Sequence, residues 1–133
     1  MARQESPLPA LRVLLLNPPF LPRFSRPQRS PAVTRSGTLY MPLWLASSCA
    51  VLEEAGHEIA FIDAPAEGLD LERTMARATA FSPALAVGDT STPSFAADLE
   101  AARTIKQRLP GCYVVLVGPH GFPLVITELL VGF

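Results

Sequence analysis

The sequence predicts an α/β domain in which helices cover both faces of an open, doubly wound parallel sheet. Three observations lead to this fold class. Short apolar runs without polar alternation, such as RVLLL at 12–16, are typical of strands that are buried on both faces. Segments with apolar residues at helical spacing separate these runs. Glycine and proline mark the junctions, so strands and helices alternate along the chain.

The first part of the chain combines one clear strand with two irregular segments. Residues 1–10 contain two prolines and no periodicity, which predicts a flexible lead. The strand at 12–16 ends at the Asn-Pro-Pro of 17–19, because consecutive prolines cannot continue a ladder. The connection at 20–39 is longer than an ordinary loop between a strand and a helix. Long loops in compact domains are usually functional or disordered.

Two helices and a second strand follow this connection. Pro42 starts a helix that runs to about Ala55, and a second strand is predicted at 58–63. A further helix is expected to end at about Phe81. Asp70 is placed to cap its N-terminus, since its carboxylate can accept hydrogen bonds from the free amides of the first turn.

The junction after the third strand organises the predicted sheet. That strand, at 85–87, leads through Gly88 into a loop of hydroxyl side chains. Thr92 is the expected N-cap and Pro93 the expected first residue of a helix that reaches about Leu109. Such a loop suits a phosphate or the polar edge of a ligand. The same residue types also serve simply as helix caps.

A fourth strand is predicted at 113–117, and it closes on the Gly-Pro-His-Gly of 118–121. Counted along the chain, the strands should lie in the order 2-1-3-4 of a Rossmann-like or flavodoxin-like sheet with right-handed crossovers. The tail at 122–133 is apolar, carries one charge and is atypical. Either it supplies a fifth strand beside the fourth, or the chain is a fragment that leaves these apolar residues exposed.

Composition excludes several function classes. The net charge of -1 gives no general attraction for nucleic acid, and the arginine-rich, proline-rich stretch up to Arg35 is expected to be a solvated arm. Cys49 and Cys112 lie far apart and match neither a zinc site nor a disulfide framework, which favours a reducing, cytoplasmic setting. The chain shows no run long enough for a membrane span and no secretory signal in residues 1–10.

Three loops are expected to form the binding site. Ligands of such sheets bind beyond the carboxyl ends of the strands, where the strand order reverses, here between the strands at 12–16 and 85–87. The loops at 17–19, 89–94 and 118–121 meet there, and their low bulk suits a large, flat or elongated ligand better than a catalytic centre. The candidate binding residues are Asn17, Pro18, Pro19, Asp89, Thr90, Ser91, Thr92, Ser94, Gly118, Pro119 and His120. No catalytic residue and no metal ligand is predicted.

Familiar catalytic patterns are missing from the sequence. A dinucleotide-binding GxGxxG is absent after the first strand, and so is a phosphate-binding P-loop. Cys49 falls inside a helix, which favours packing over a nucleophilic role. His57 precedes the second strand, at the end of the sheet opposite to the expected site. His120 lies at the ligand end, where it could bond a ligand, cap a backbone group or face solvent.

Four segments in this order resemble the N-terminal cobalamin-binding domain of B12-dependent radical SAM proteins, of the oxidative cyclase and hopanoid-associated type. They are VLLLNPP at 13–19, YMPLWLASSCAVLEEAGHEIAFIDAP at 40–65, TSTPSFAADLEAARTIKQRLP at 90–110 and VVLVGPH at 114–120. The resemblance implies that residues 11–121 form a domain that holds cobalamin against the carboxyl ends of its strands. Residues 17–19 would approach the corrin, while 90–94 and 118–120 would contact its amides and the nucleotide tail.

Two departures from the family limit what the chain can do alone. The family's partner domain binds a 4Fe-4S cluster and S-adenosylmethionine through a CxxxCxxC motif, which this chain does not contain. Cobalamin and such a domain are therefore the expected partners. Other cobalamin proteins have a DxHxxG loop after the first strand whose histidine binds cobalt, but Asn-Pro-Pro stands here. Cobalt would then have water, no ligand or an unidentified group on that face. Beyond His120 the tail no longer resembles the family, which suggests truncation, a shifted reading frame or a freestanding variant.

Two other functions compete with cobalamin binding. A flavodoxin-like protein for FMN or another nucleotide would use the hydroxyls of 90–94 as its phosphate site. Its weakness is that such a loop normally follows the first strand, where prolines remove amide donors. An inactive interaction fragment is favoured by the atypical tail and by the missing cluster motif.

Overall fold

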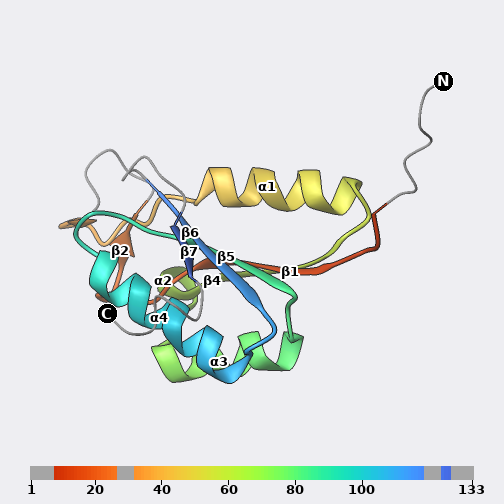
Figure 1. Ribbon diagram of the computed structural model, residues 1–133. Helices are drawn as coiled ribbons and strands as arrows, with labels where there is room; N and C mark the ends of the chain where they lie inside the picture. Colours follow the sequence, from red (N-terminus) through yellow and green to blue (C-terminus); the bar gives the residue numbers. More distant parts are fainter. Residues whose placement is uncertain (1–7, 27–31, 119–123, 127–133) are drawn as a thin grey trace.

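A five-stranded mixed sheet forms the centre of the molecule (Figure 1). The computed structural model describes residues 8–26, 32–118 and 124–126. Four strands are parallel, and the fifth runs antiparallel at one edge. In spatial order they are β4 (Glu58–Asp63), β1 (Arg12–Asn17), β5 (Leu85–Asp89), β6 (Tyr113–Val117) and β7 (Leu124–Ile126). The domain is therefore a Rossmann-like α/β fold, as predicted at the level of fold class.

The sheet differs from the expected 2-1-3-4 sheet in two respects, which are the numbering of its strands along the chain and the direction of its fifth strand. The long connection after β1 contains a small antiparallel hairpin of β2 (Phe24–Ser25) and β3 (Ala32–Val33), which forms a sheet of its own. The strand counted second in the sequence is thus β4. In addition, β7 from the tail pairs antiparallel to β6, whereas a flavodoxin-like sheet is parallel throughout. Strands of two residues leave no hydrophobic period, so the sequence pattern missed the hairpin.

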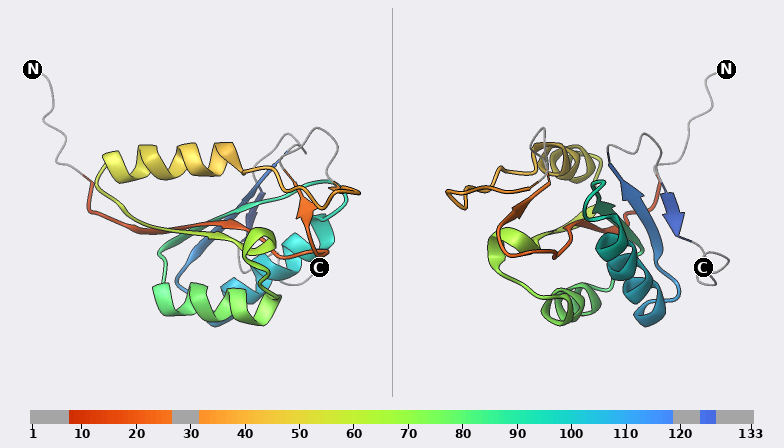
Figure 2. Two further views of the ribbon diagram at one scale, coloured as in Figure 1. Left: turned by 180° about the vertical axis from the view of Figure 1, so that it is seen from behind. Right: turned by 90° about the vertical axis from the view of Figure 1, so that its left-hand side faces the viewer.

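Helices cover the two faces of the sheet unequally (Figure 2). On one face lies α1 (Leu43–Glu54), and on the other lie α3 (Leu71–Phe81) and α4 (Phe95–Arg108). The short α2 (Ala64–Glu67) follows directly after β4. Within the described residues, none of these helices is both long and apolar enough to span a bilayer.

The core consists of two layers that share β1. Leu14 and Leu16 point to the side of α3 and α4, where the larger cluster of buried side chains lies. Val13 and Leu15 point to the other side and pack with Leu45 of α1 in a smaller cluster. Side chains alternate across a strand, so an uninterrupted apolar run fits a strand that is covered on both faces. That prediction for residues 12–16 is confirmed.

Helix starts show where local rules hold and where they fail. The Asp70 side chain accepts a hydrogen bond from the Arg73 amide at 2.8 Å, so the predicted cap of α3 is confirmed. The expected N-cap at Thr92 is wrong, because α4 begins at Phe95 with Ser94 in the cap position. The Ser94 hydroxyl donates to Asp98 in the first turn of α4 at 2.6 Å, and residues 92–94 form a turn ahead of the helix.

Parts of the predicted lead and tail lie outside the described residues. Residues 1–7 belong to this group, while 8–10 are exposed and have no regular structure. Of the tail, 124–126 form β7, and 122–123 and 127–133 are outside the description. The cytoplasmic location stays a prediction.

Candidate functional site

The ends of β1, β5 and β6 bring the described residues that follow them, 18–19, 90–94 and Gly118, to one edge of the sheet. Asp89 is in register with Val117, Leu16 with Gly88, and Asn17 with Asp63, so the parallel strands finish at about the same height. This edge, with residues 17–19, 89–94 and Gly118, is called the carboxyl rim below. It lies at the reversal of the strand order, where sheets of this type bind ligands.

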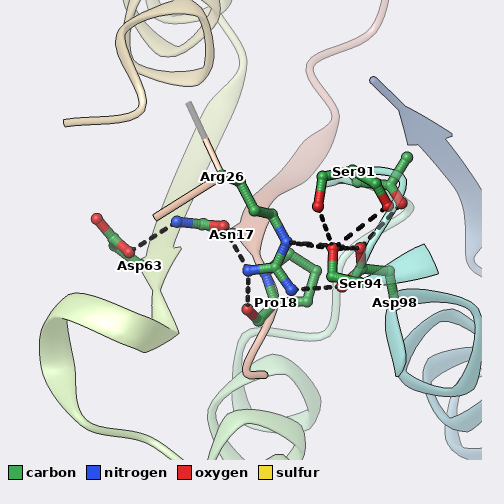
Figure 3. Close-up of polar contacts among 8 residues, drawn as sticks. Asn17, Pro18, Arg26, Asp63, Ser91, Ser94 and Asp98 are labelled. Atoms are coloured by element: carbon green, nitrogen blue, oxygen red, sulfur yellow. Dashed lines mark hydrogen bonds and ion pairs between the residues drawn. The ribbon is translucent and has the colours of Figure 1, made fainter. Parts of the chain in front are cut away.

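Arg26, from the end of the β2 segment, lies at the centre of the carboxyl rim (Figure 3). Its Nη1 donates to the side-chain oxygen of Asn17 at 3.0 Å and to the Pro18 carbonyl at 2.5 Å. Its Nη2 donates to the Asp98 carboxylate at 2.5 Å. Both charged side chains are 0% exposed. The guanidinium thus ties the end of β1 to the first turn of α4.

Hydroxyl groups complete the surroundings of this ion pair. Thr90 and Ser94 each donate to Oδ2 of Asp98, at 2.9 and 2.6 Å. The hydroxyls of Ser91 and Ser94 are 2.5 Å apart, and Arg26 Nε donates to Ser94 at 3.2 Å. A buried charge is tolerated when it is paired and its remaining lone pairs are satisfied. These five residues, called the Arg26 network below, meet that condition.

The loops after β5 and β6 touch without an intervening side chain. The Thr90 amide donates to the Val117 carbonyl at 3.0 Å. A Cβ placed on Gly118 would lie 2.2 Å from the Thr90 carbonyl oxygen, closer than any real Cβ contact. This close approach therefore requires glycine at position 118. Because residue 118 has no side chain, the carboxyl rim presents backbone there, and this stretch is called the backbone ledge below.

Two further carboxyl groups border the network. Asp63 accepts from the Asn17 amide at 3.0 Å, and burial raises its pKa. Burial also raises the pKa of Asp89 to about 6, although Arg26 and a hydrogen bond from the Trp44 side chain act in the opposite direction. Desolvation disfavours the charged form of a carboxyl group, and here it outweighs the nearby cation.

The structure separates the predicted site residues into three groups. Six of them are buried, and of these Asn17, Pro18, Thr90, Ser91 and Ser94 bond within or to the Arg26 network while Asp89 borders it. Thr92 is exposed, and Pro19 and Gly118 are half-buried. Pro119 and His120 lie outside the described residues. The side chains brought together thus face inward more than toward a ligand.

Sequence reasoning missed the two residues at the centre of this arrangement. Arg26 belongs to the stretch that was expected to be a solvated arm, and that expectation is wrong for this side chain, which is fully buried. Asp98 was not among the candidate site residues. The signal that could have found the pair is a lone acid on the apolar side of α4, beside Ala101, Ala102 and Ile105.

The geometry makes the carboxyl rim a rigid support with few chemically free groups. No group of three or more metal-binding side chains occurs in the part of the chain that the structure describes. Comparison of the chain with protein-family models, with curated proteins and with solved structures gave no match. A functional assignment therefore rests on the residues and on their arrangement.

Proposed function

We propose that this chain is a cobalamin-binding domain that holds the cofactor at the carboxyl rim. The observation that carries the proposal is the meeting of the loops at 17–19 and 89–94 and the start of the loop at 118, which are distant in sequence, at one edge of the sheet. These are the loops on which the resemblance to B12-dependent radical SAM proteins places the cofactor. Arg26 bonds to Asn17 and Pro18 and so ties the first of these loops to the network residues of the second, and the Thr90 amide donates to the Val117 carbonyl beside the third.

The residues of the carboxyl rim fit a broad, uncharged macrocycle with peripheral amides. The backbone ledge at Gly118 and the exposed turn at Thr92 present polar groups with little bulk. The inward residues of the Arg26 network act as positioning residues and do not touch the cofactor. When bound, cobalamin supplies methyl-transfer or radical chemistry. The Asn-Pro-Pro loop at 17–19 offers cobalt no imidazole ligand.

A nucleotide phosphate suits the same place less well. Anions bind at helix N-termini through free amides and neighbouring hydroxyls. Here the hydroxyls of Thr90 and Ser94 already donate to Asp98 in the first turn of α4, so they are not free to donate to a phosphate. FMN binding is thus the second outcome that a ligand test must be able to detect.

The reaction itself would need a second unit. The chain lacks the cysteine motif for a 4Fe-4S cluster, so we propose a radical SAM domain as the partner that binds the cluster and S-adenosylmethionine. If cobalamin does not bind, a role as an interaction fragment gains support.

Gel filtration with hydroxocobalamin tests the proposal. The full chain is mixed with the cofactor, and the visible absorbance that elutes with the folded protein is measured, with FMN in a parallel run. We expect cobalamin to co-elute and FMN to separate. A folded chain that emerges colourless, or one that retains FMN alone, contradicts the proposal.

Two variants locate the binding surface. Thr92→Trp places bulk on the exposed turn of the carboxyl rim, and we expect it to weaken cobalamin binding. Its control is Ala80→Trp, at an exposed position near the end of α3. Equal affinity of the two variants would place the cofactor elsewhere.

A further inference from the structure

A cavity lies beside the carboxyl rim, and of its lining only Pro19 belongs to the proposed cobalamin site. Its volume is about 600 Å³, within the range of about 300–1,000 Å³ that is common for small-molecule sites. Three segments line it: 19–23 after β1, Gly37 and Leu39 from the connection to α1, and 64–70 after β4. Apart from Pro19, a candidate binding residue, and Asp70, a predicted helix cap, sequence analysis had assigned no role to these residues.

The walls of this cavity are largely apolar. Side chains of three different segments contribute, so the hollow belongs to the tertiary fold and not to one loop. The main apolar residues are Phe20, Leu21, Pro22, Leu39 and Leu69. An apolar lining with a few polar groups is typical of sites for small organic molecules.

One charged group of the cavity has no partner among the residues that the structure describes. Arg23 and Asp70 are the charged residues of the lining. Asp70 already accepts from the Arg73 amide as the cap of α3. Arg23, which is exposed, has no hydrogen bond or ion pair with any residue that the structure describes. Within the described part of the chain, the cavity therefore offers an unpaired guanidinium and a carboxylate that is already engaged.

The backbone fixes the place of this cation. Arg23 has φ of 57°, in the left-handed region that side chains other than glycine rarely adopt. A hydrogen bond of 3.1 Å from the Phe24 amide to the Leu21 carbonyl closes the turn around it. A Cβ on Gly37 would lie 2.5 Å from Nη1 of Arg23, so the glycine leaves room for the guanidinium. Such strain is often retained at functional positions.

We propose that this cavity binds an organic monoanion with an apolar body and a single carboxylate, which pairs with Arg23. One guanidinium neutralises one negative charge and matches the two oxygens of a carboxylate. A phosphate dianion would need a second cation, and the described lining provides none. Of the described lining, Pro19 alone is shared with the cobalamin surface, and Arg23 is not, so the two proposals can fail independently.

Titration of the isotope-labelled full chain with octanoate, octanol and octylammonium, followed by NMR, tests the proposal. We expect octanoate to shift the amide signals of Gly37, Gly68 and Leu69, and to bind more tightly than octanol by about fivefold. Octylammonium should bind least. Tighter binding of octanol or octylammonium, or shifts confined to other parts of the chain, would overturn the proposal.

Matched variants separate the charge from the cavity. Arg23→Gln should lower the affinity for octanoate to that for octanol, while Arg35→Gln, exposed in the same connection, should change neither. Ala66→Phe should fill the cavity and abolish binding of all three probes, with Ala80→Phe as its control. Undiminished octanoate binding by Arg23→Gln or Ala66→Phe, both folded, would refute the assignment. Hydroxocobalamin binding by Arg23→Gln should be unchanged.

Discussion

Removal of the buried guanidinium is the most demanding test of how the carboxyl rim is built. In Arg26→Met an apolar side chain of similar length replaces the cation, and the hydrogen bonds to Asn17, Pro18, Ser94 and Asp98 are lost. The Asp98 carboxylate then stays buried without its counter-charge. Breaking a fully buried ion pair in this way costs about 3–5 kcal/mol.

The size of this loss makes it easy to measure. With a urea m-value of about 2 kcal/mol/M, a loss of about 4 kcal/mol lowers the unfolding midpoint by about 2 M. The control is Arg108→Met, which removes a surface ion pair to Glu72 whose side chains are 37% and 77% exposed. Exposed pairs contribute about 0–1 kcal/mol, so this midpoint should hardly move.

Urea unfolding followed by circular dichroism and by the fluorescence of Trp44 provides the assay. A second substitution sharpens it, because Asp98→Asn removes the uncompensated charge while its side-chain oxygen can still accept from Thr90 and Ser94. The double variant Arg26→Met, Asp98→Asn should therefore be more stable than Arg26→Met alone. If Arg26→Met unfolds at the same urea concentration as Arg108→Met, the reasoning about the Arg26 network is refuted.

Three further expectations concern single residues of the carboxyl rim. Because burial raises the pKa of Asp89 from 3.8 in the unfolded chain to about 6, its contribution to stability falls as the pH rises from about 4 to 6. Asp89→Asn should accordingly stabilise the fold at pH 8 and lose this advantage at pH 4. Urea unfolding at the two pH values measures the difference, and an equal effect at both would contradict the burial of a charge. Ser94→Ala removes buried hydrogen bonds and should cost about 1–3 kcal/mol, whereas Thr92→Ala should stay within about 0.5 kcal/mol. The reverse ranking in thermal unfolding would restore Thr92 as the cap. Gly118→Ala should lower the free energy of unfolding by about 1–3 kcal/mol, because its Cβ meets backbone. At the other end of β6, the Cβ of Gly111→Ala meets no atom within 4 Å, so this variant should be tolerated. Equal unfolding midpoints of the two variants would rule out the close approach.

Local patterns were sufficient for the main elements of the fold. The strand at 12–16 could be predicted from its own residues, since a strand that is buried on both faces has consecutive apolar side chains. The cap at Asp70 is also local, because its acceptor and the Arg73 amide are three residues apart. The alternation of strands and helices predicted the edge where the loops meet, because it implies parallel strands, and the carboxyl ends of parallel strands all lie on one side of the sheet.

The interior of the carboxyl rim could not be read in the same way. Arg26 and Asp98 are 72 residues apart in the sequence. The residues around an arginine in a proline-rich stretch do not indicate whether its side chain is solvated or buried. The start of α4 lies later in the sequence than predicted, and buried hydrogen bonds are again involved. Hydrogen bonds of Ser94 to Asp98 and Ser91 compete with the simple capping rule that favoured Thr92. The hairpin of β2 and β3 is fixed by pairing across the connection and has too few residues for a pattern.

NMR mapping of the cobalamin contact surface on the labelled full chain tests the central claim most directly. The account predicts that hydroxocobalamin shifts the amide signals of Asn17, Thr92 and Gly118 at the carboxyl ends of the strands. Signals at the opposite end, such as those of His57 and Gly111, should stay in place. Shifts at that opposite end, or none at all from a folded chain, would contradict the account.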